Sequence, residues 1–170
     1  MKLTVADRER FATAIHEAGH AVAVVLAGDR IVDLRLNDGD VDAPGQCTHQ
    51  DVPENEERGV AFAGPWSEER WRRGARPTPQ QLRASLDRNG SDAAFLEASA
   101  GVGADPREVE PILEAAWPAV KQIARELFIR GHLQHDDVAH ELGLDGTAHD
   151  HSVVASIRSG ILPVPAWLPI

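Results

Sequence analysis

The stretch His16-Glu17-Ala18-Gly19-His20 decides how the rest of this sequence is interpreted. In a helix, the two histidines lie four residues apart on one face, where both imidazoles can reach one metal ion. Glu17 adjoins them and can accept a proton from a water that the metal polarises. The apolar run that follows, 21–27, indicates that the helix is buried. The motif therefore predicts a zinc site with His16 and His20 as ligands and Glu17 as the general base.

The composition is typical of one compact domain. The chain has 170 residues, of which 42% are hydrophobic and 26% charged, and this is enough to build a core. Its net charge of −10 repels phosphate backbones, so we expect no nucleic-acid partner. Cys47 is the single cysteine, which excludes an internal disulfide. The charged N-terminus is unlike a signal peptide and no apolar stretch could span a bilayer, so we expect a cytoplasmic protein with no membrane partner.

Hydrophobic periodicity predicts a mainly α fold with a small β layer, an α+β arrangement. Apolar residues recur at helical spacing over about 6–27, 54–73, 79–88, 91–100, 106–130 and 134–142, with Ser91 as the expected N-cap of the fourth helix. The segment 30–36 alternates as a strand does, and 46–49 is expected to return beside it as a β-hairpin or edge strand. We assign residues 1–150 to one domain and 151–170 to a Pro-rich C-terminal tail.

The third zinc ligand does not follow from the motif. Position 26 is Leu26, so the extended form with a third histidine six residues after His20 is absent. A residue distant in the sequence must complete the site. The candidates are Glu68, Glu69, Asp92, His135, His140 and the segment His149-Asp150-His151. The spacing of His135 and His140 suits one helical face poorly, and 149–151 is typical of a polar loop.

Several segments, in the same order, resemble the peptidase domain of FtsH-type ATP-dependent zinc proteases. The match is specific over His16–Ala21, which reads H-E-A-G-H-A. Ala63–Glu69 resembles a later helix of that family, and Asn89-Gly90-Ser91-Asp92 resembles the start of the helix that carries its aspartate ligand. The resemblance covers about residues 6–143. It implies a helical, zincin-like metallopeptidase domain with Asp92 as the third zinc ligand.

The resemblance also suggests roles beside the metal. Glu68 and Glu69 are expected to orient a zinc-bound histidine, although both could be ordinary surface acids of a helix. The segment Gln46, Cys47, Thr48 and His49 falls where the family has its substrate-binding edge strand, and such a strand can bind a peptide by strand addition.

Taken together, the motif and the resemblance predict a zinc-dependent endopeptidase that acts without ATP. The sequence shows neither a nucleotide-binding loop nor an ATPase domain. We therefore expect a peptide or an unfolded protein as substrate, unless a separate partner protein or a homo-oligomer delivers it. The alternative is a catalytically silent zinc-binding relative that regulates or binds a partner protein.

Overall fold

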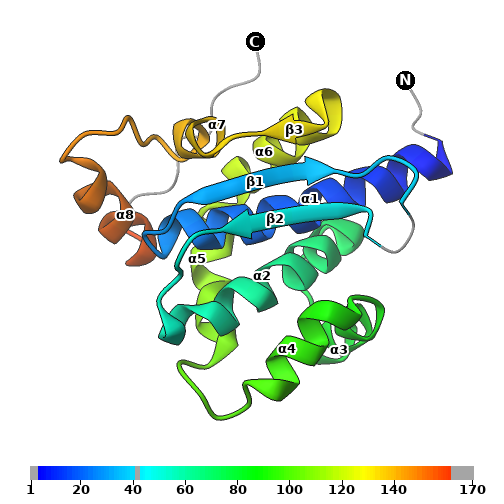
Figure 1. Cartoon of the computed structure of the whole chain (residues 1–170). Helices are drawn as coiled ribbons and strands as arrows, with labels where there is room; N and C mark the ends of the chain where they lie inside the picture. The colour runs from blue at the N-terminus through cyan, green and yellow to red at the C-terminus, as the bar shows by residue number, and fades with distance from the viewer. Residues whose placement is uncertain (1–3, 41–42, 162–170) are drawn as a thin grey trace.

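The computed structural model of the protein describes residues 4–40 and 43–161. As the sequence predicts, it is mainly helical with one small antiparallel sheet (Figure 1). The elements in chain order are α1 (Val5–Leu26), β1 (Ile31–Leu36), β2 (Gly45–His49), α2 (Glu54–Arg73), α3 (Pro79–Arg88), α4 (Gly90–Ala98), the 3-10 helix η1 (Pro106–Val109), α5 (Glu110–Ala115), α6 (Trp117–Arg130), β3 (His132–Leu133), α7 (His135–Glu141) and α8 (Asp150–Arg158).

Helix α1 lies at the centre of the described structure. A reciprocal capping box starts it: Thr4 Oγ1 accepts a hydrogen bond from the Asp7 amide, and Asp7 accepts one from the Thr4 amide. From Ala14 to Leu26 the helix is buried on nearly every side, because α2, α6 and the sheet all pack against it. No helix in the described ranges combines the length and the apolar character needed to cross a membrane.

The sheet has the strand order β2-β1-β3, and both pairings are antiparallel. Residues 45–49 form the returning strand predicted from the sequence, and β2 is an edge strand because β1 has β3 on its other side. Leu34 of β1 faces Cys47 of β2 across the ladder. Strand β3 was not predicted, because two residues are too few to show a period.

Two predicted elements differ in the structure. The single helix expected over 106–130 is divided into η1, α5 and α6, with a break at Ala116. Pro118 explains this break, because it has no N–H to donate to the preceding turn and its ring restricts Trp117. Ser91 is not the N-cap of α4. That position belongs to Asn89, whose side chain makes other contacts.

The tail predicted over 151–170 begins as a packed helix. Helix α8 spans Asp150–Arg158 and buries Ile157 in the core. Arg158 donates hydrogen bonds to the Leu26 carbonyl at the end of α1 and to Glu56 of α2. Residues 151–158 are therefore part of the folded domain. The remainder of the predicted tail, 162–170, lies outside the described residues.

Helices α1 and α2 approach each other closely at Gly19. A Cβ atom there would lie 2.5 Å from Ser67 Oγ and 2.6 Å from the Ala63 carbonyl oxygen. Such distances are far shorter than van der Waals contact, and the second atom is backbone that cannot rotate away. Only glycine therefore permits this packing of the two helices.

We expect Gly19→Val to destabilise the protein by about 2–3 kcal/mol, because it forces the two helices apart. Urea unfolding followed by circular dichroism measures the change. Gly59→Ala in α2 is the matched control: its Cβ would meet only Val109 Cβ, at 3.6 Å. Helix propensity predicts that this control is stabilising by about 0.5–1 kcal/mol. Equal stabilities for the two variants would contradict the role of Gly19.

Candidate metal centre

Three side chains that the sequence singles out converge in the structure. His16 and His20 come from α1, and Asp92 comes from the first turn of α4. Asp92 Oδ2 lies 3.1 Å from His16 Nε2, and Asp92 Oδ1 lies 3.6 Å from His20 Nε2. The two Nε2 atoms are 2.9 Å apart. All three residues offer a ligand atom within a sphere that one metal ion could occupy.

The orientation of His20 is fixed by the backbone of α2. His20 Nδ1 lies 2.7 Å from the Val60 carbonyl oxygen. A carbonyl oxygen can only accept, so Nδ1 carries the proton and donates it to this bond. The lone pair of the neutral ring then belongs to Nε2, the atom that faces His16 and Asp92. This is the tautomer that a metal ligand needs.

Glu68 lies beside His16, on the side where a residue that orients the ring would be expected. Glu68 Oε2 lies 3.4 Å from His16 Nδ1, on the side of the ring opposite Asp92. Asn89 donates a hydrogen bond of 3.1 Å to the same oxygen, and Arg72 donates one of 2.7 Å to Oε1. Three groups, His16, Asn89 and Arg72, thus contact this buried carboxylate.

Glu69 does not share this role. Both of its carboxylate oxygens are bound by arginines, Oε1 by Arg73 at 2.6 Å and Oε2 by Arg88 at 2.7 Å. One helical residue turns the side chain by about 100° from that of Glu68, away from the histidines. The expectation that Glu69 orients a metal-bound histidine is therefore wrong.

The site has a strongly negative electrostatic environment. Burial disfavours the charged imidazole, but the carboxylates of Asp92 and Glu68 outweigh it and raise the pKa of His16 to about 10. Burial also opposes charge on the acids. The histidines nonetheless hold the pKa of Asp92 well below its usual range, and His16 with Arg72 lowers that of Glu68 to about 2. Buried carboxylates around two imidazoles are an environment that attracts a cation.

Gly64 of α2 leaves the space in which the ligand atoms meet. A Cβ there would lie 2.3 Å from His20 Nε2 and 2.7 Å from His16 Nε2. The two imidazole nitrogens, one carboxylate and this free volume suit a zinc ion, which commonly takes two histidines and an acid in hydrolytic enzymes. The residues present therefore fit the metal that the sequence motif implies.

Glu17 of α1 is buried, and its side chain lies against the start of β2. A Cβ on Gly45 would lie 2.6 Å from Glu17 Oε1, so a glycine allows the strand to cover the carboxylate. Burial raises the pKa of Glu17, although the charges of His16 and His20 oppose the shift. Because its pKa is raised, this carboxylate binds a proton more readily than an exposed glutamate, as a general base requires.

A groove of about 310 Å³ opens beside the histidine pair. Its lining includes His20 and Asp92 from the metal group, Cys47 and His49 from β2, and Phe95 from α4. Phe95 is 40% exposed, which is unusual for a large apolar residue next to polar groups. The groove therefore runs between the edge strand and α4, past the proposed ligands.

Of the four residues predicted to form a substrate-binding strand, two line the groove and two contact the neighbouring strand β1. Cys47 and His49 line the groove, whereas Gln46 accepts a hydrogen bond from Arg35 on the neighbouring strand. Thr48 faces Asp33 in the ladder. Burial, with Glu17 and Asp33 nearby, raises the pKa of the Cys47 thiol, so it stays protonated. The thiol is not one of the three converging ligand groups.

The other candidate ligands lie elsewhere in the fold. His135 begins α7 and contacts the Ile31 amide at 3.4 Å, and His140 is in the last turn of the same helix. His149 interacts with Ser152, and Asp150 accepts amide hydrogen bonds as α8 begins. In Figure 1 helix α7 lies beside β1 and β3 and helix α8 lies beyond the ends of the strands, both away from α4. Among the described candidates, Asp92 alone reaches both motif histidines with its carboxylate.

Sequence reasoning missed four contributors to this site. Val60 acts through its backbone carbonyl, which every residue type has, so its identity in the sequence gives no sign of this contact. Gly64 acts by letting the two histidines approach α2 closely, and Asn89 acts through a hydrogen bond to Glu68, which lies 21 residues earlier in the sequence. Phe95 looks like a core residue of an amphipathic helix, but α4 buries none of its residues. Only the glycine next to Pro65, inside a predicted helix, could have signalled a special packing requirement.

Comparison with protein families found no family model that matches the chain, and comparison with curated proteins found no matching relative.

We expect Gly64→Ala to lower the affinity for zinc by at least about tenfold, since its methyl group occupies the space between the ligand atoms. Competition with a chromophoric chelator measures the affinity. Gly59→Ala, one turn earlier in α2, should bind zinc like the unmodified protein. Unchanged zinc binding by Gly64→Ala would place the metal, if one binds, away from His16 and His20.

Proposed function

We propose that this protein is a zinc-dependent metallopeptidase that hydrolyses peptide bonds without ATP. The observation that carries the proposal is the convergence of His16, His20 and Asp92 beside a surface groove, with the buried acid Glu17 close enough to interact electrostatically with all three. The resemblance of His16–Ala21 to the FtsH-type peptidases supports the same assignment. A structural zinc site would need the ligands but not Glu17 or the groove.

Each residue has a defined task in this reaction. His16, His20 and Asp92 would hold the metal through Nε2, Nε2 and the carboxylate. Bound zinc supplies a Lewis acid that makes water a nucleophile near neutral pH and stabilises negative charge on the scissile carbonyl. Glu17 accepts the proton from the attacking water and returns it to the leaving amine. Its raised pKa suits both transfers.

The groove suits an extended peptide. Strand β2 forms the edge of the sheet, so its outer backbone groups can pair with a substrate strand. Phe95 on the opposite wall offers an apolar contact for a substrate side chain. A flexible segment of an unfolded protein or a free peptide can adopt this conformation. These are the substrates that we propose.

Glu17→Gln should abolish most cleavage while zinc binding is retained. The amide is isosteric with the carboxylate but cannot accept the proton, so we expect the rate to fall at least about a hundredfold. Cleavage of fluorescein-labelled unfolded casein, with and without a chelator, measures activity. Elemental analysis gives the zinc content of each variant.

Glu97→Gln is the matched control, because Glu97 is an exposed acid of α4 and is not among the groove-lining residues. It should cleave at the unmodified rate. A Glu17→Gln variant that cleaves casein as fast as the unmodified protein would overturn the mechanism. Zinc binding without cleavage by the unmodified protein, over a broad set of peptides, would instead favour a catalytically silent zinc-binding relative that recognises a partner.

Phe95→Ala should raise KM for substrates with a large apolar side chain next to the cleaved bond. The ring is only partly exposed, so its loss should lower kcat/KM about three- to tenfold. Fluorogenic peptides that differ only in that side chain measure the effect. Val102→Ala, at a similarly exposed position outside the groove lining, is the control. An equal loss for polar and apolar peptides would contradict a specific contact.

A further inference from the structure

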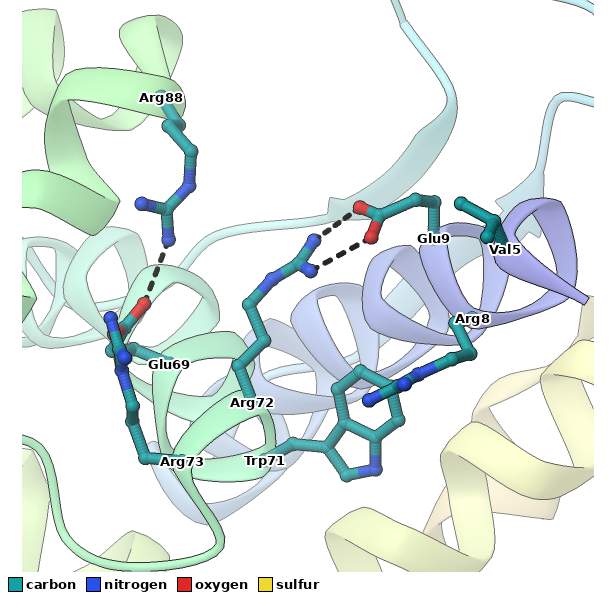
Figure 2. A pocket seen from close by; sticks show the side chains of 8 residues that line it. All are labelled: Val5, Arg8, Glu9, Glu69, Trp71, Arg72, Arg73 and Arg88. Carbon is teal, nitrogen blue, oxygen red and sulfur yellow. Dashed lines mark hydrogen bonds and ion pairs between the residues drawn. The ribbon is translucent and has the colours of Figure 1, made fainter. Parts of the chain in front are cut away.

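A second cavity, of about 520 Å³, lies at the far end of α1 and α2 from the substrate groove. It is formed by the first two turns of α1, the last turn of α2 and the end of α3 (Figure 2). It shares no lining residue with the groove beside Asp92. Its volume lies within the range of small-molecule binding sites. The peptidase mechanism makes no use of it.

The cavity is basic, although the protein is acidic. Its charged lining consists of Arg8, Arg72, Arg73, Arg88, Glu9 and Glu69. These residues carry a net charge of +2, in a chain whose net charge is −10. Gathering four guanidinium groups around one hollow costs electrostatic free energy, which a bound anion would offset.

The two glutamates do not satisfy the four arginines. Glu9 accepts both terminal nitrogens of Arg72, at 3.0 and 2.6 Å. Glu69 binds Arg73 through Nε and Arg88 through one terminal nitrogen. The guanidinium of Arg8 makes no hydrogen bond or ion pair to any described residue, and within the same part of the chain neither do the terminal nitrogens of Arg73. Donors for a ligand therefore remain on two sides of the cavity.

Trp71 supplies an apolar wall to the same cavity. Its indole packs on Phe11, with ring centroids 5.3 Å apart, and this contact holds the ring in place. In Figure 2 the indole lies between the side chains of Arg8 and the arginines of α2. A ligand with an anionic group and an attached ring could therefore contact the arginines and Trp71 together.

We propose that this cavity binds a small organic phosphate, with the phosphoryl group on the arginines and its organic part against Trp71. Guanidinium groups bind phosphate and carboxylate oxygens in paired hydrogen bonds. Here they project from three helices, so their donors are not coplanar. The tetrahedral oxygens of a phosphoryl group match such an arrangement, whereas the two oxygens of a carboxylate lie in one plane.

Isothermal titration calorimetry with phenyl phosphate tests the proposal. At 0.15 M sodium chloride we expect a Kd below about 1 mM, and weaker binding of inorganic phosphate, which lacks the ring. Arg8→Gln and Arg73→Gln should each weaken phenyl phosphate binding at least about tenfold. Trp71→Leu should remove the advantage of phenyl phosphate over inorganic phosphate. Arg107→Gln, an exposed arginine paired with Asp105 outside the cavity, is the matched control and should bind like the unmodified protein.

Arg8→Gln is the decisive variant, because the Arg8 side chain forms no ion pair with a described residue and Glu9, the acid whose charge it influences, keeps its two bonds to Arg72. Circular dichroism at increasing temperature checks that each variant is folded. Unchanged affinity in Arg8→Gln would overturn the proposal and would place any phosphate elsewhere, for example at a metal bound by the histidines. Phthalate binding as tightly as phenyl phosphate would overturn the assignment to phosphate. The test measures binding alone, so its outcome does not depend on the proposed peptidase activity.

Discussion

The close approach of α1 to α2 is the constraint on which the rest of the structure depends. Gly19 lets the backbone of α1 lie against Ala63 and Ser67, and Gly64 of α2 faces the two histidines. The same approach brings the Val60 carbonyl within 2.7 Å of His20. Helix packing and the orientation of the proposed ligands therefore have one origin. A looser contact between these helices would free the histidine rings before it unfolded the core.

The position of Asp92 follows from that contact through a short series of hydrogen bonds. Glu68 faces His16 from α2, and Asn89 donates to Glu68 and to the Ser85 carbonyl. Asn89 is also where α3 ends and α4 begins, so this amide fixes the start of the helix that carries Asp92. These bonds place Asp92 beside the histidines, although α4 contributes no buried residue to the core.

The sequence was sufficient for the parts of the fold that depend on local patterns. The helix around His16 and His20 has an apolar second half followed by Gly28, and it was predicted nearly to its ends. The structure places the Asp92 carboxylate beside both histidines, but no local signal in 89–92 distinguishes a metal ligand from an ordinary acid in the first turn of a helix. Glu68 and Glu69 are adjacent and chemically alike, so only their directions on α2 separate their roles.

What could not be predicted depends on contacts between distant segments. Strand β3 exists because β1 provides a partner, and α8 exists because Ile157 and Arg158 find places against the core and the end of α1. Pro118 is present in the sequence, but the prediction of one helix over 106–130 followed the apolar stripe alone. In the structure that stripe is still buried, since η1, α5 and α6 share one face.

Arg72 connects the candidate metal centre to the first turns of α1. This one guanidinium binds Glu9 on the first turns of α1 and Glu68 beside His16. Glu9 is exposed and stands well before the motif, so it would ordinarily be regarded as a site that tolerates any substitution. Its loss would leave Arg72 free to move, and with it the carboxylate behind a proposed ligand. Mutational sensitivity in this protein should therefore extend along the surface of α1, beyond the five residues by which the site is recognised.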